Sequence, residues 1–497
     1  MSSSALDLAT PEAVARYEPV IGLEVHVQLA TATKIFCGCP TGFGAPPNIN
    51  VCPVCLGLPG ALPVLNRRAV ELAVQGALAL GCTIRQHSRF ARKNYFYPDL
   101  PKGYQISQYD EPFAEHGFLD IVADGRQRRI GITRVHMEDD AGKSIHDGFR
   151  DSDRYSYVDL NRTGTPLIEI VSQPDMRSSD EAYAYLTEVK QRLQFVGAST
   201  CDMEKGHLRC DANVSVRLRG VEKFGTKAEV KNLNSFRFLK QALDFEIARQ
   251  VAVLEGGGRV VQETRLYNPD RGETFGMRSK EEAHDYRYFP EPDLVPLRIG
   301  EEWLTRLQSQ MPELPSRKRA RFIADYGLRE YDADVLTATR AASEYFETAA
   351  RVSGDPKTAA NWVMGDLMGL LKAEGKEIGE SPVSAENLGE LVRMLANGEL
   401  SGKLAKEVFP KMFATGDSPA AIVEREGLKQ ISDTGELERV IEEVIAGNPK
   451  QVDQYRGGKT TVINFLVGQA MRATRGQAQP DTVTAILKRK LGGGETC

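Results

Sequence analysis

Long apolar runs are absent from this chain, although 41% of its 497 residues are hydrophobic. A helix needs roughly 18 or more consecutive apolar residues to cross a bilayer, so we expect no membrane span. The segment Met1–Tyr17 is rich in Ser and Ala and holds Arg16 as its only base, which excludes a secretory signal and an Arg-rich transit peptide. We interpret it as the flexible N-terminus of a cytoplasmic protein.

Several motifs of nucleotide and amide chemistry are also missing. Gly458-Lys459-Thr460 resembles the end of a phosphate-binding G-x-x-x-x-G-K-[ST] loop, but Asp453 stands where the first glycine is required. The chain has no G-x-S-x-G elbow, no Gly/Ser-rich amidase stretch and no H-E-x-x-H motif. If the chain uses ATP, metal and carboxylates on a sheet must hold the nucleotide.

Four of the eight cysteines form two close pairs. Cys37-Gly-Cys39 and Cys52-Pro-Val-Cys55 lie in Gly/Pro-rich turns and are separated by twelve residues. Four sulfur ligands at about 2.3 Å are typical of a structural zinc site. Disulfides would require an oxidising compartment, and ordinary buried thiols would not cluster in pairs. We therefore predict a structural Zn²⁺ knuckle over residues 37–55.

The pattern of hydrophobic residues changes along the chain. Residues 18–290 alternate apolar and polar positions, as half-buried strands do. Helical periodicity interrupts them over Arg67–Leu80, Ser179–Phe195 and Ser235–Leu254. The proline-rich segment Tyr286–Pro296 ends this region.

Beyond residue 296 every pattern is that of an amphipathic helix. The predicted helices are Glu301–Gln310, Ser316–Tyr326, Tyr331–Val352, Pro356–Glu374, Ser384–Asn397, Ser401–Ala414, Ser418–Glu426, Thr434–Ala446, Pro449–Arg456, Thr461–Arg475 and Gln479–Leu491. The length allows two to four domains. We predict an α+β protein with a sheet domain over 18–295, a helical domain over 296–412 and a helical tail domain over 413–497.

Four strand-like runs carry acids and histidine on their polar face. They are Leu23–Leu29 with Glu24 and His26, Arg134–Glu138 with His136 and Glu138, Cys210–Arg217 with Asp211 and Asn213, and Thr226–Lys231 with Glu229 and Lys231. If these strands are neighbours, their carboxylates crowd one surface, and a cation such as Mg²⁺ or Mn²⁺ must offset the repulsion. An antiparallel sheet with one solvated face alternates in the same way, so that alternative stays open.

Basic residues concentrate in two stretches. Residues 450–490 hold eight Lys or Arg, among them Lys459, Arg472 and Arg475. A second stretch, residues 85–104, mixes Lys and Arg with aromatic residues. This mixture suits a single-stranded RNA end, because cations neutralise phosphates and rings stack on bases. Taken alone, each stretch favours the alternative of a solvated basic face with core aromatics.

Longer motifs make the chain recognisable. They are Ile21–His26, Pro53–Gly60, Arg92–Tyr104, His136–Lys143, Asp159–Leu167, Arg209–Asn213, Glu229–Ser235 and Arg287–Asp293. In this order and over essentially the full length, the sequence resembles the B subunits of bacterial aspartyl/glutamyl-tRNA(Asn/Gln) amidotransferases.

The resemblance implies a fold and a reaction. The fold is a cradle-like catalytic domain with a central antiparallel sheet, followed by a helical domain and a small helical tail domain that binds tRNA. The reaction is phosphorylation by Mg²⁺-ATP of the Glu or Asp side chain on a misacylated tRNA(Gln) or tRNA(Asn), followed by displacement of the phosphate by ammonia. Because the chain lacks amidase elements, the resemblance implies a heterotrimer with two partners, a glutaminase (the amidase, or A subunit) and a small C subunit.

The resemblance also implies roles for single residues. The catalytic and Mg²⁺-binding set is Glu24, His26, Glu138, Asp211 and Glu229, with His26 either a ligand or a residue that orients the acyl phosphate. Asn213 and Lys231 are expected to support this set or to contact phosphate. Lys93, Tyr95 and Tyr104 are expected at the tRNA acceptor end, and Lys459, Arg472 and Arg475 on the tRNA body. Zn²⁺ is expected on Cys37, Cys39, Cys52 and Cys55.

Two rival functions remain at this stage. The first is a zinc-stabilised tRNA chaperone whose acidic face is merely solvated. The second is an ATP-dependent carboxylate–amine ligase that acts on a small molecule. The first predicts that carboxylate substitutions spare catalysis, and the second predicts that the basic tail is dispensable.

Overall fold

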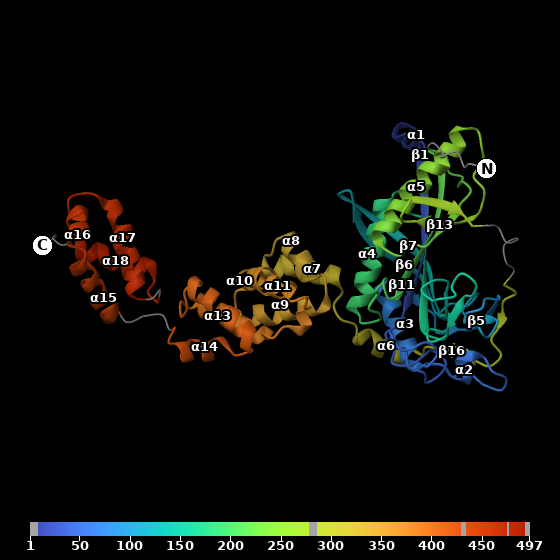
Figure 1. The fold of residues 1–497 in the computed structure, drawn as a ribbon, viewed down its shortest axis with the longest axis horizontal. Helices are drawn as coiled ribbons and strands as arrows, with labels where there is room; N and C mark the ends of the chain where they lie inside the picture. The colour runs from blue at the N-terminus through green and yellow to red at the C-terminus, as the bar shows by residue number, and fades with distance from the viewer. Residues whose placement is uncertain (1–7, 278–285, 429–433, 475–476, 493–497) are drawn as a thin grey trace. The chain divides into compact units, whose positions relative to one another are not determined.

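The computed structural model describes residues 8–277, 286–428, 434–474 and 477–492. The chain folds as two compact units, Met1–Leu314 and Pro315–Cys497 (Figure 1). In the described residues no helix is both long enough and apolar enough to span a membrane. The α+β class is confirmed, because the first unit holds a large sheet with helices and the second is helical.

A nine-stranded sheet forms the centre of the first unit. Its strands, in spatial order, are β14 (Glu273–Gly276), β13 (Thr264–Asn268), β12 (Ala228–Lys231), β11 (Leu208–Leu218), β1 (Tyr17–Gln28), β10 (Pro166–Ser172), β7 (Arg126–Asp139), β6 (Ala114–Ala123) and β2 (Thr83–Ile84). The four strands predicted to carry acids all belong to this sheet. The strand β10 separates β1 from β7, so the acidic strands do not form one uninterrupted block.

The sheet is mixed, and the expected purely antiparallel arrangement is wrong at one pair. β12 and β13 run parallel, whereas the other pairs are antiparallel. The cause is the connection: the chain leaves β12, passes through α5 (Phe236–Glu255) and returns in β13. A helical crossover of this kind brings the next strand back in the same direction.

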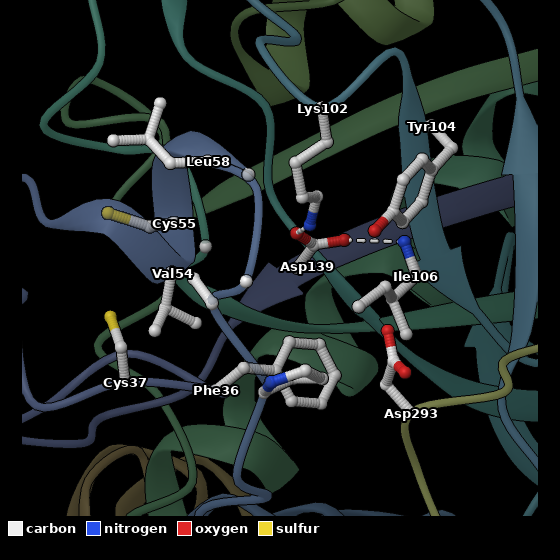
Figure 2. A pocket seen from close by; sticks show the side chains of 15 residues that line it. Phe36, Cys37, Val54, Cys55, Leu58, Lys102, Tyr104, Ile106, Asp139 and Asp293 are labelled. Carbon is white, nitrogen blue, oxygen red and sulfur yellow. Dashed lines mark hydrogen bonds and ion pairs between the residues drawn. The ribbon is translucent and has the colours of Figure 1, made fainter.

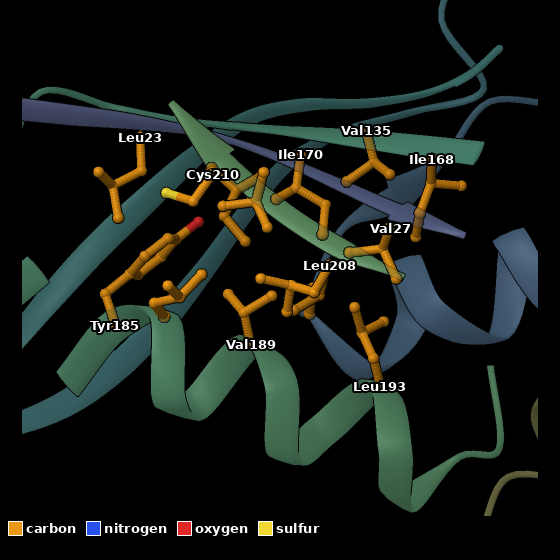
Figure 3. Close-up of a cluster of buried hydrophobic side chains, with 14 of the residues drawn as sticks. Leu23, Val27, Val135, Ile168, Ile170, Tyr185, Val189, Leu193, Leu208 and Cys210 are labelled. Carbon is orange, nitrogen blue, oxygen red and sulfur yellow. The ribbon is translucent and has the colours of Figure 1, made fainter. Parts of the chain in front are cut away.

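Helices cover the apolar face of the sheet. They include α3 (Arg67–Ala79), α4 (Ser179–Phe195) and α5, each within two residues of its predicted bounds. Ser178 accepts a hydrogen bond from the Glu181 amide and so begins α4. Figure 3 shows Val189 and Leu193 of α4 directed at the buried side chains of β1, β10 and β11. Each such side chain contributes about 1.5–3 kcal/mol by burial.

Short strands cover part of the opposite, polar face. β4 (Ala91–Asn94) pairs with β5 (Tyr104–Ser107) and with β15 (Phe289–Pro290). The Ile106 amide of β5 donates to Asp139 Oδ1 at the end of β7, at 2.7 Å. Two further two-stranded pairs are β3 (His87–Ser88) with β16 (Leu297–Arg298), and β8 (Lys143–Ile145) with β9 (Tyr157–Asp159). The short helices α1 (Pro11–Ala15) and α2 (Pro53–Leu56) and the helix α6 (Glu301–Ser309) complete the unit.

The second unit contains only helices among its described residues. They are α7 (Pro315–Tyr326), α8 (Glu330–Leu336), α9 (Arg340–Ser353), α10 (Pro356–Asn361), α11 (Met368–Ala373), α12 (Ala385–Ala396), α13 (Gly402–Thr415), α14 (Pro419–Glu426), α15 (Thr434–Gly447), α16 (Pro449–Arg456), α17 (Ile463–Ala473) and α18 (Pro480–Leu491). A π-helical segment, Trp362–Leu367, joins α10 to α11. Single 3-10 turns occupy Ile378–Glu380 and Thr460–Val462.

One predicted helix of this unit is wrong. The expected helix Tyr331–Val352 is two helices, α8 and α9. Thr339 adopts extended backbone angles and accepts a hydrogen bond from the Ala342 amide at 3.1 Å, so it caps a new helix. Side-chain oxygens of this kind compete with the helical hydrogen bonds and favour a helix start over continuation.

Among the described residues, buried apolar side chains form three separate hydrophobic cores. The first extends from Tyr17 to Leu307, the second from Phe322 to Val423 and the third from Leu437 to Leu491. The two later cores both lie in the second unit. The domain boundaries expected at 295 and 412 stay predictions.

Candidate functional site

Polar side chains of β1, β10 and β7 converge on one face of the sheet. His26 lies opposite Glu169, and Glu169 lies opposite His136. The His26 ring nitrogen Nε2 lies 3.3 Å from Glu169 and 3.5 Å from Glu138. His136 Nε2 lies 3.3 Å from Glu169 and 3.7 Å from Glu138. We call these four residues the carboxylate cluster.

Three members of the carboxylate cluster are buried, and His26 is half-buried. Only 2% of Glu138, 7% of Glu169 and 3% of His136 is exposed. The Ser107 hydroxyl of β5 donates to Glu138 Oε2 at 3.3 Å from the covering layer. The alternative of a merely solvated sheet face is therefore wrong for the end of β7, because a solvated face would leave Glu138 open to water.

Mutual pairing keeps the carboxylates ionised. Burial raises the pKa of Glu169, but the two histidines outweigh burial and hold that pKa well below its usual value. Burial lowers the pKa of His136, but the carboxylates of Glu169 and Glu138 raise it to about 9. Ionised, buried carboxylates are the groups that attract a cation.

Three members of the cluster can hold a metal ion. One ligand atom each from His26, Glu138 and Glu169 lies within 4.8 Å of the others. Sequence reasoning missed Glu169, because β10 reads as a continuous apolar run of the kind typical of fully buried strands. The available signal was the single charged residue inside that run, Pro166–Ser172.

Two of the three remaining predicted carboxylates, Asp211 and Glu229, form a second group on β11 and β12. Lys231 Nζ lies 2.7 Å from Asp211 and 2.9 Å from Glu229. A lysine thus provides the cation that the sequence argument assigned to a metal. The predicted five-residue set is therefore split into two groups.

Glu24 lies between the two groups. The Asn213 side chain donates to Glu24 Oε1 at 3.0 Å. Burial raises the pKa of Glu24, and the carboxylates of Glu169 and Glu229 raise it further. Asn213 accordingly contacts a predicted catalytic carboxylate, as expected for a supporting residue.

The residues expected at the acceptor end lie on or beside one strand pair: the Lys93 ammonium is 5.8 Å from the centre of the Tyr95 ring, and Tyr104 of β5 pairs with Asn94 of β4. Lys93 lies in β4 with its ammonium 4.8 Å from the centre of the Tyr286 ring. Burial lowers the pKa of Lys93, but Glu138 and other neighbours outweigh burial and raise it. Burial and then Glu138 raise the pKa of Tyr95. Lys93 and Tyr95 are thus electrostatically coupled to the carboxylate cluster.

Tyr104 instead lines a cavity of about 200 Å³ (Figure 2). Lys102 and Asp139 form a buried ion pair in its wall. The apolar part of the wall is formed by residues such as Phe36, Val54 and Leu58. Because Asp139 directly follows Glu138 on β7, the cavity adjoins the strand end that carries the carboxylate cluster.

The four predicted zinc ligands do come together. One sulfur each of Cys37, Cys39, Cys52 and Cys55 lies within 4.8 Å of the others. A hydrogen bond from Cys37 is the largest cause that lowers the pKa of Cys55, to about 4. Clustered sulfurs with a thiolate among them fit a soft, tetrahedrally coordinated metal ion.

Two of the three predicted tRNA-binding tail residues are described. Lys459 and Arg472 are exposed, and neither pairs with a carboxylate in the described part of the chain. Arg475 lies outside the described residues. By contrast, Arg489 and Lys490 of the same basic stretch pair with Glu438 of α15.

Comparison with known proteins places the chain in a family. Residues 19–305 match the model of the GatB/GatE catalytic domain, and residues 344–491 match that of the GatB domain. The chain belongs to the GatB/GatE family. Both the carboxylate cluster and the cysteine cluster lie in the range of the GatB/GatE catalytic domain, whereas Lys459 and Arg472 lie in the range of the GatB domain.

Members of the GatB/GatE family are similar to this chain over nearly its full length. The B subunit of the aspartyl/glutamyl-tRNA(Asn/Gln) amidotransferase from Carboxydothermus hydrogenoformans is 56% identical over 96% of this chain and 99% of the relative. Proteins of the same name from Persephonella marina and Geobacter sulfurreducens are 54% and 55% identical over 96% of this chain, and over 99% and 100% of their own lengths.

Proposed function

We propose that this chain is the B subunit of an aspartyl/glutamyl-tRNA(Asn/Gln) amidotransferase, a carbon–nitrogen ligase with glutamine as amido donor. The observation that carries the proposal is the identity of 54–56% to proteins of that name across nearly the whole chain. The buried carboxylate cluster inside the matched catalytic domain supports it. The proposed substrate is Glu esterified to tRNA(Gln) or Asp esterified to tRNA(Asn).

The proposed reaction has two steps. The side-chain carboxylate of the esterified amino acid attacks the γ-phosphorus of ATP, ADP leaves, and an acyl phosphate forms. Ammonia then attacks the carbonyl carbon, the bond from that carbon to the phosphate oxygen breaks, and inorganic phosphate leaves as the new amide loses a proton. Phosphorylation is required because a carboxylate is a poor electrophile.

His26, Glu138 and Glu169 would hold Mg²⁺. When bound, the ion offsets the charge of the phosphates and of the reacting carboxylate. Glu169 is added to the ligands expected from the sequence, and the geometry of His26 supports a ligand over an orienting role. Glu24, Asp211 and Glu229, also expected as Mg²⁺ ligands, lie outside this three-residue group. The neighbouring strands present Glu24, Asp211 and Glu229 to the same surface, where we retain them as catalytic carboxylates supported by Asn213 and Lys231.

Around this centre the chain positions the substrate. Lys93 and Tyr95, beside the carboxylate cluster, contact the acceptor end, with Tyr104 at the adjacent cavity. Exposed cations of the tail, Lys459 and Arg472, contact the tRNA backbone. The proposed domains of this cytoplasmic protein are the cradle-like catalytic domain over 18–295, the helical domain over 296–412 and the tail over 413–497.

Ammonia comes from a partner protein in this proposal. The sequence lacks amidase elements, so the amidase partner (the A subunit) releases ammonia from glutamine, and the small C subunit makes the assembly a heterotrimer. A site closed to water is required, because water would otherwise hydrolyse the acyl phosphate before ammonia arrives. The burial of Glu138 and Glu169 is consistent with that requirement.

The cysteine cluster holds a structural Zn²⁺ in this proposal. We expect close to one equivalent of zinc in the purified protein, measured by elemental analysis, and loss of that zinc in Cys52→Ser. Because Cys82 is buried away from the cluster, Cys82→Ser is the matched control and keeps its zinc. A wild-type protein without zinc contradicts the assignment.

The catalytic role of the cluster is tested in the reconstituted heterotrimer with misacylated tRNA, ATP and ammonium chloride, which removes the need for glutamine. We expect Glu138→Ala to lower amide formation by on the order of 100-fold or more, with tRNA affinity unchanged. The exposed Glu204→Ala is the matched control.

Two outcomes would favour the rival functions. Full activity in Glu138→Ala would favour a tRNA chaperone whose chemistry lies in a partner. An unchanged rate on acyl-tRNA after deletion of residues 429–497 would favour a small-molecule ligase. This deletion removes the third core and leaves the second core intact.

A further inference from the structure

Lys34 is the most deeply buried charged side chain beside the cysteine cluster. None of its surface is exposed. Its ammonium donates to the Asn50 carbonyl oxygen at 2.6 Å and lies 3.6 Å from Cys55 Sγ, within hydrogen-bonding distance of a sulfur acceptor. The Lys34 amide donates to the Cys39 carbonyl at 2.9 Å, so the backbone of this residue is also tied to the cysteine cluster.

The charge of Lys34 requires a buried anion. An ammonium buried without a counter-charge costs several kcal/mol. No carboxylate of the described residues forms an ion pair with Lys34, and the Asn50 carbonyl is neutral. The Cys55 sulfur is therefore the acceptor that can carry the compensating charge.

A metal-bound cysteine cluster provides such an anion permanently. Four thiolates outnumber the charge of one Zn²⁺, so the complex carries a net negative charge. We infer that Lys34 belongs to this metal site, as the buried counter-charge that hydrogen bonds to the Cys55 thiolate and stabilises the zinc-bound state. The inference rests on the zinc site proposed above.

Lys34 also connects the cysteine cluster to the loop that follows β9. A Cβ atom at Gly164 would lie 3.5 Å from Lys34 Cδ and 3.4 Å from Cys55 Cβ, so this glycine packs on both side chains. The Ile35 amide donates to the Gly164 carbonyl at 2.9 Å, and the Gly164 amide donates to the Asp140 carbonyl at 2.8 Å. Lys34 thus lies where the metal site meets the end of β7.

The test is Lys34→Met, which keeps the length of the side chain and removes its charge. Groups that hydrogen bond to metal ligands typically contribute 10- to 100-fold to metal affinity. We expect zinc affinity, measured in the full chain by competition with a chromophoric chelator, to fall about 10- to 100-fold. The exposed Lys223→Met is the matched control and keeps the wild-type affinity.

The outcomes separate the two proposals. If wild-type protein binds zinc and Lys34→Met binds it equally well, the role of Lys34 is wrong and the zinc site stands. If wild-type protein binds no zinc, the zinc site itself is wrong, and the role of Lys34 with it.

A second measurement uses the unmodified chain, in case Lys34→Met does not fold. Acetic anhydride acetylates accessible amines, and mass spectrometry of the peptides reports each lysine. We expect Lys34 to react more slowly in zinc-loaded than in zinc-stripped protein, because a buried ammonium that is hydrogen-bonded to a thiolate is protected from the reagent. Lys223 should react equally in both states. Equal reactivity of Lys34 in the two states would overturn the inference.

Discussion

The chemistry of the sheet face depends on which residue balances each buried charge. In the carboxylate cluster, the Nε2 atoms of His26 and His136 each lie 3.3 Å from Glu169 Oε2. The histidines therefore offset the negative charge of the carboxylates. On β11 and β12, Lys231 does the same for Asp211 and Glu229. The carboxylate cluster is the one in which a ligand atom each from His26, Glu138 and Glu169 lies within 4.8 Å of the others, and it is therefore the one suited to a metal ion.

A role of Glu169 as a metal ligand predicts the effect of Glu169→Gln. This substitution keeps the shape of the side chain and removes its charge. The Mg²⁺ concentration needed for half-maximal amide formation should rise about 10- to 100-fold, because one charged ligand is lost. A Mg²⁺ titration of the reconstituted enzyme measures this. The exposed Glu204→Gln serves as control, and an unchanged titration in Glu169→Gln would remove Glu169 from the ligand set.

Among the elements, the helices on the apolar face hold the strands that carry the site. Leu193 of α4 is fully buried and points toward the sheet (Figure 3). Gly76 of α3 makes room for it, since a Cβ atom there would lie 3.0 Å from Leu193 Cδ2. Positioning of the carboxylate cluster thus depends on close packing behind the sheet.

Leu193→Ala should lower the free energy of unfolding of the first unit by about 2–5 kcal/mol, through lost burial and the cavity left behind. The chain has two tryptophans, and Trp303 packs against the first core whereas Trp362 belongs to the second. In a Trp362→Phe background, fluorescence during urea unfolding therefore reports the first unit. Thr187→Ala, at an exposed position of α4, should change the free energy little.

Across the molecule as a whole, charge is distributed between the units in different ways. In the first unit, the ionised groups of the carboxylate cluster lie on a covered face of the sheet. In the second unit, the helices that form the third core carry exposed cations such as Lys459 and Arg472. Exposed cations without carboxylate partners are available for phosphates, and their contribution to binding falls with salt. Catalysis and tRNA affinity should therefore respond to different substitutions.

The double variant Lys459→Gln/Arg472→Gln should weaken tRNA binding roughly 10-fold and lower the slope of log affinity against log salt by about one per lost contact. Filter binding at several salt concentrations measures both quantities. The matched control is Lys372→Gln/Lys376→Gln, at exposed positions outside the third core. An unaltered slope would exclude these two residues from the tRNA interface.

Local patterns predicted much of the secondary structure. Helical periodicity over Ser179–Phe195 predicted α4, and these bounds are those observed. The error at Tyr331–Val352 has a local cause as well, because a threonine inside a helical pattern can cap a new helix instead of continuing the old one. Packing decides whether such a residue caps a new helix or continues the old one, and the periodicity of the sequence carries no information about packing.

For the candidate site, alternation along each strand correctly put Glu24 with His26 and Asp211 with Asn213 on a common face. It did not say which strands are neighbours, and the insertion of β10 between β1 and β7 brought Glu169 into the cluster. The catalytic roles of these residues stay predictions. Periodicity did not identify Glu169, since a single acid in an apolar run has no periodic signal; its charge inside that run was the only sign of it.

The order of residues along the chain was enough to establish the elements, the α+β class, the paired cysteines and the family. These properties depend on local periodicity, turn chemistry and long ordered motifs, all of which are linear features. Three-dimensional packing was needed to establish that His26, Glu138 and Glu169 meet, that Lys231 neutralises the other acids, and that Lys34 is buried against Cys55. The reason is that charge pairing depends on distance in space, and the order of strands in the sheet sets that distance.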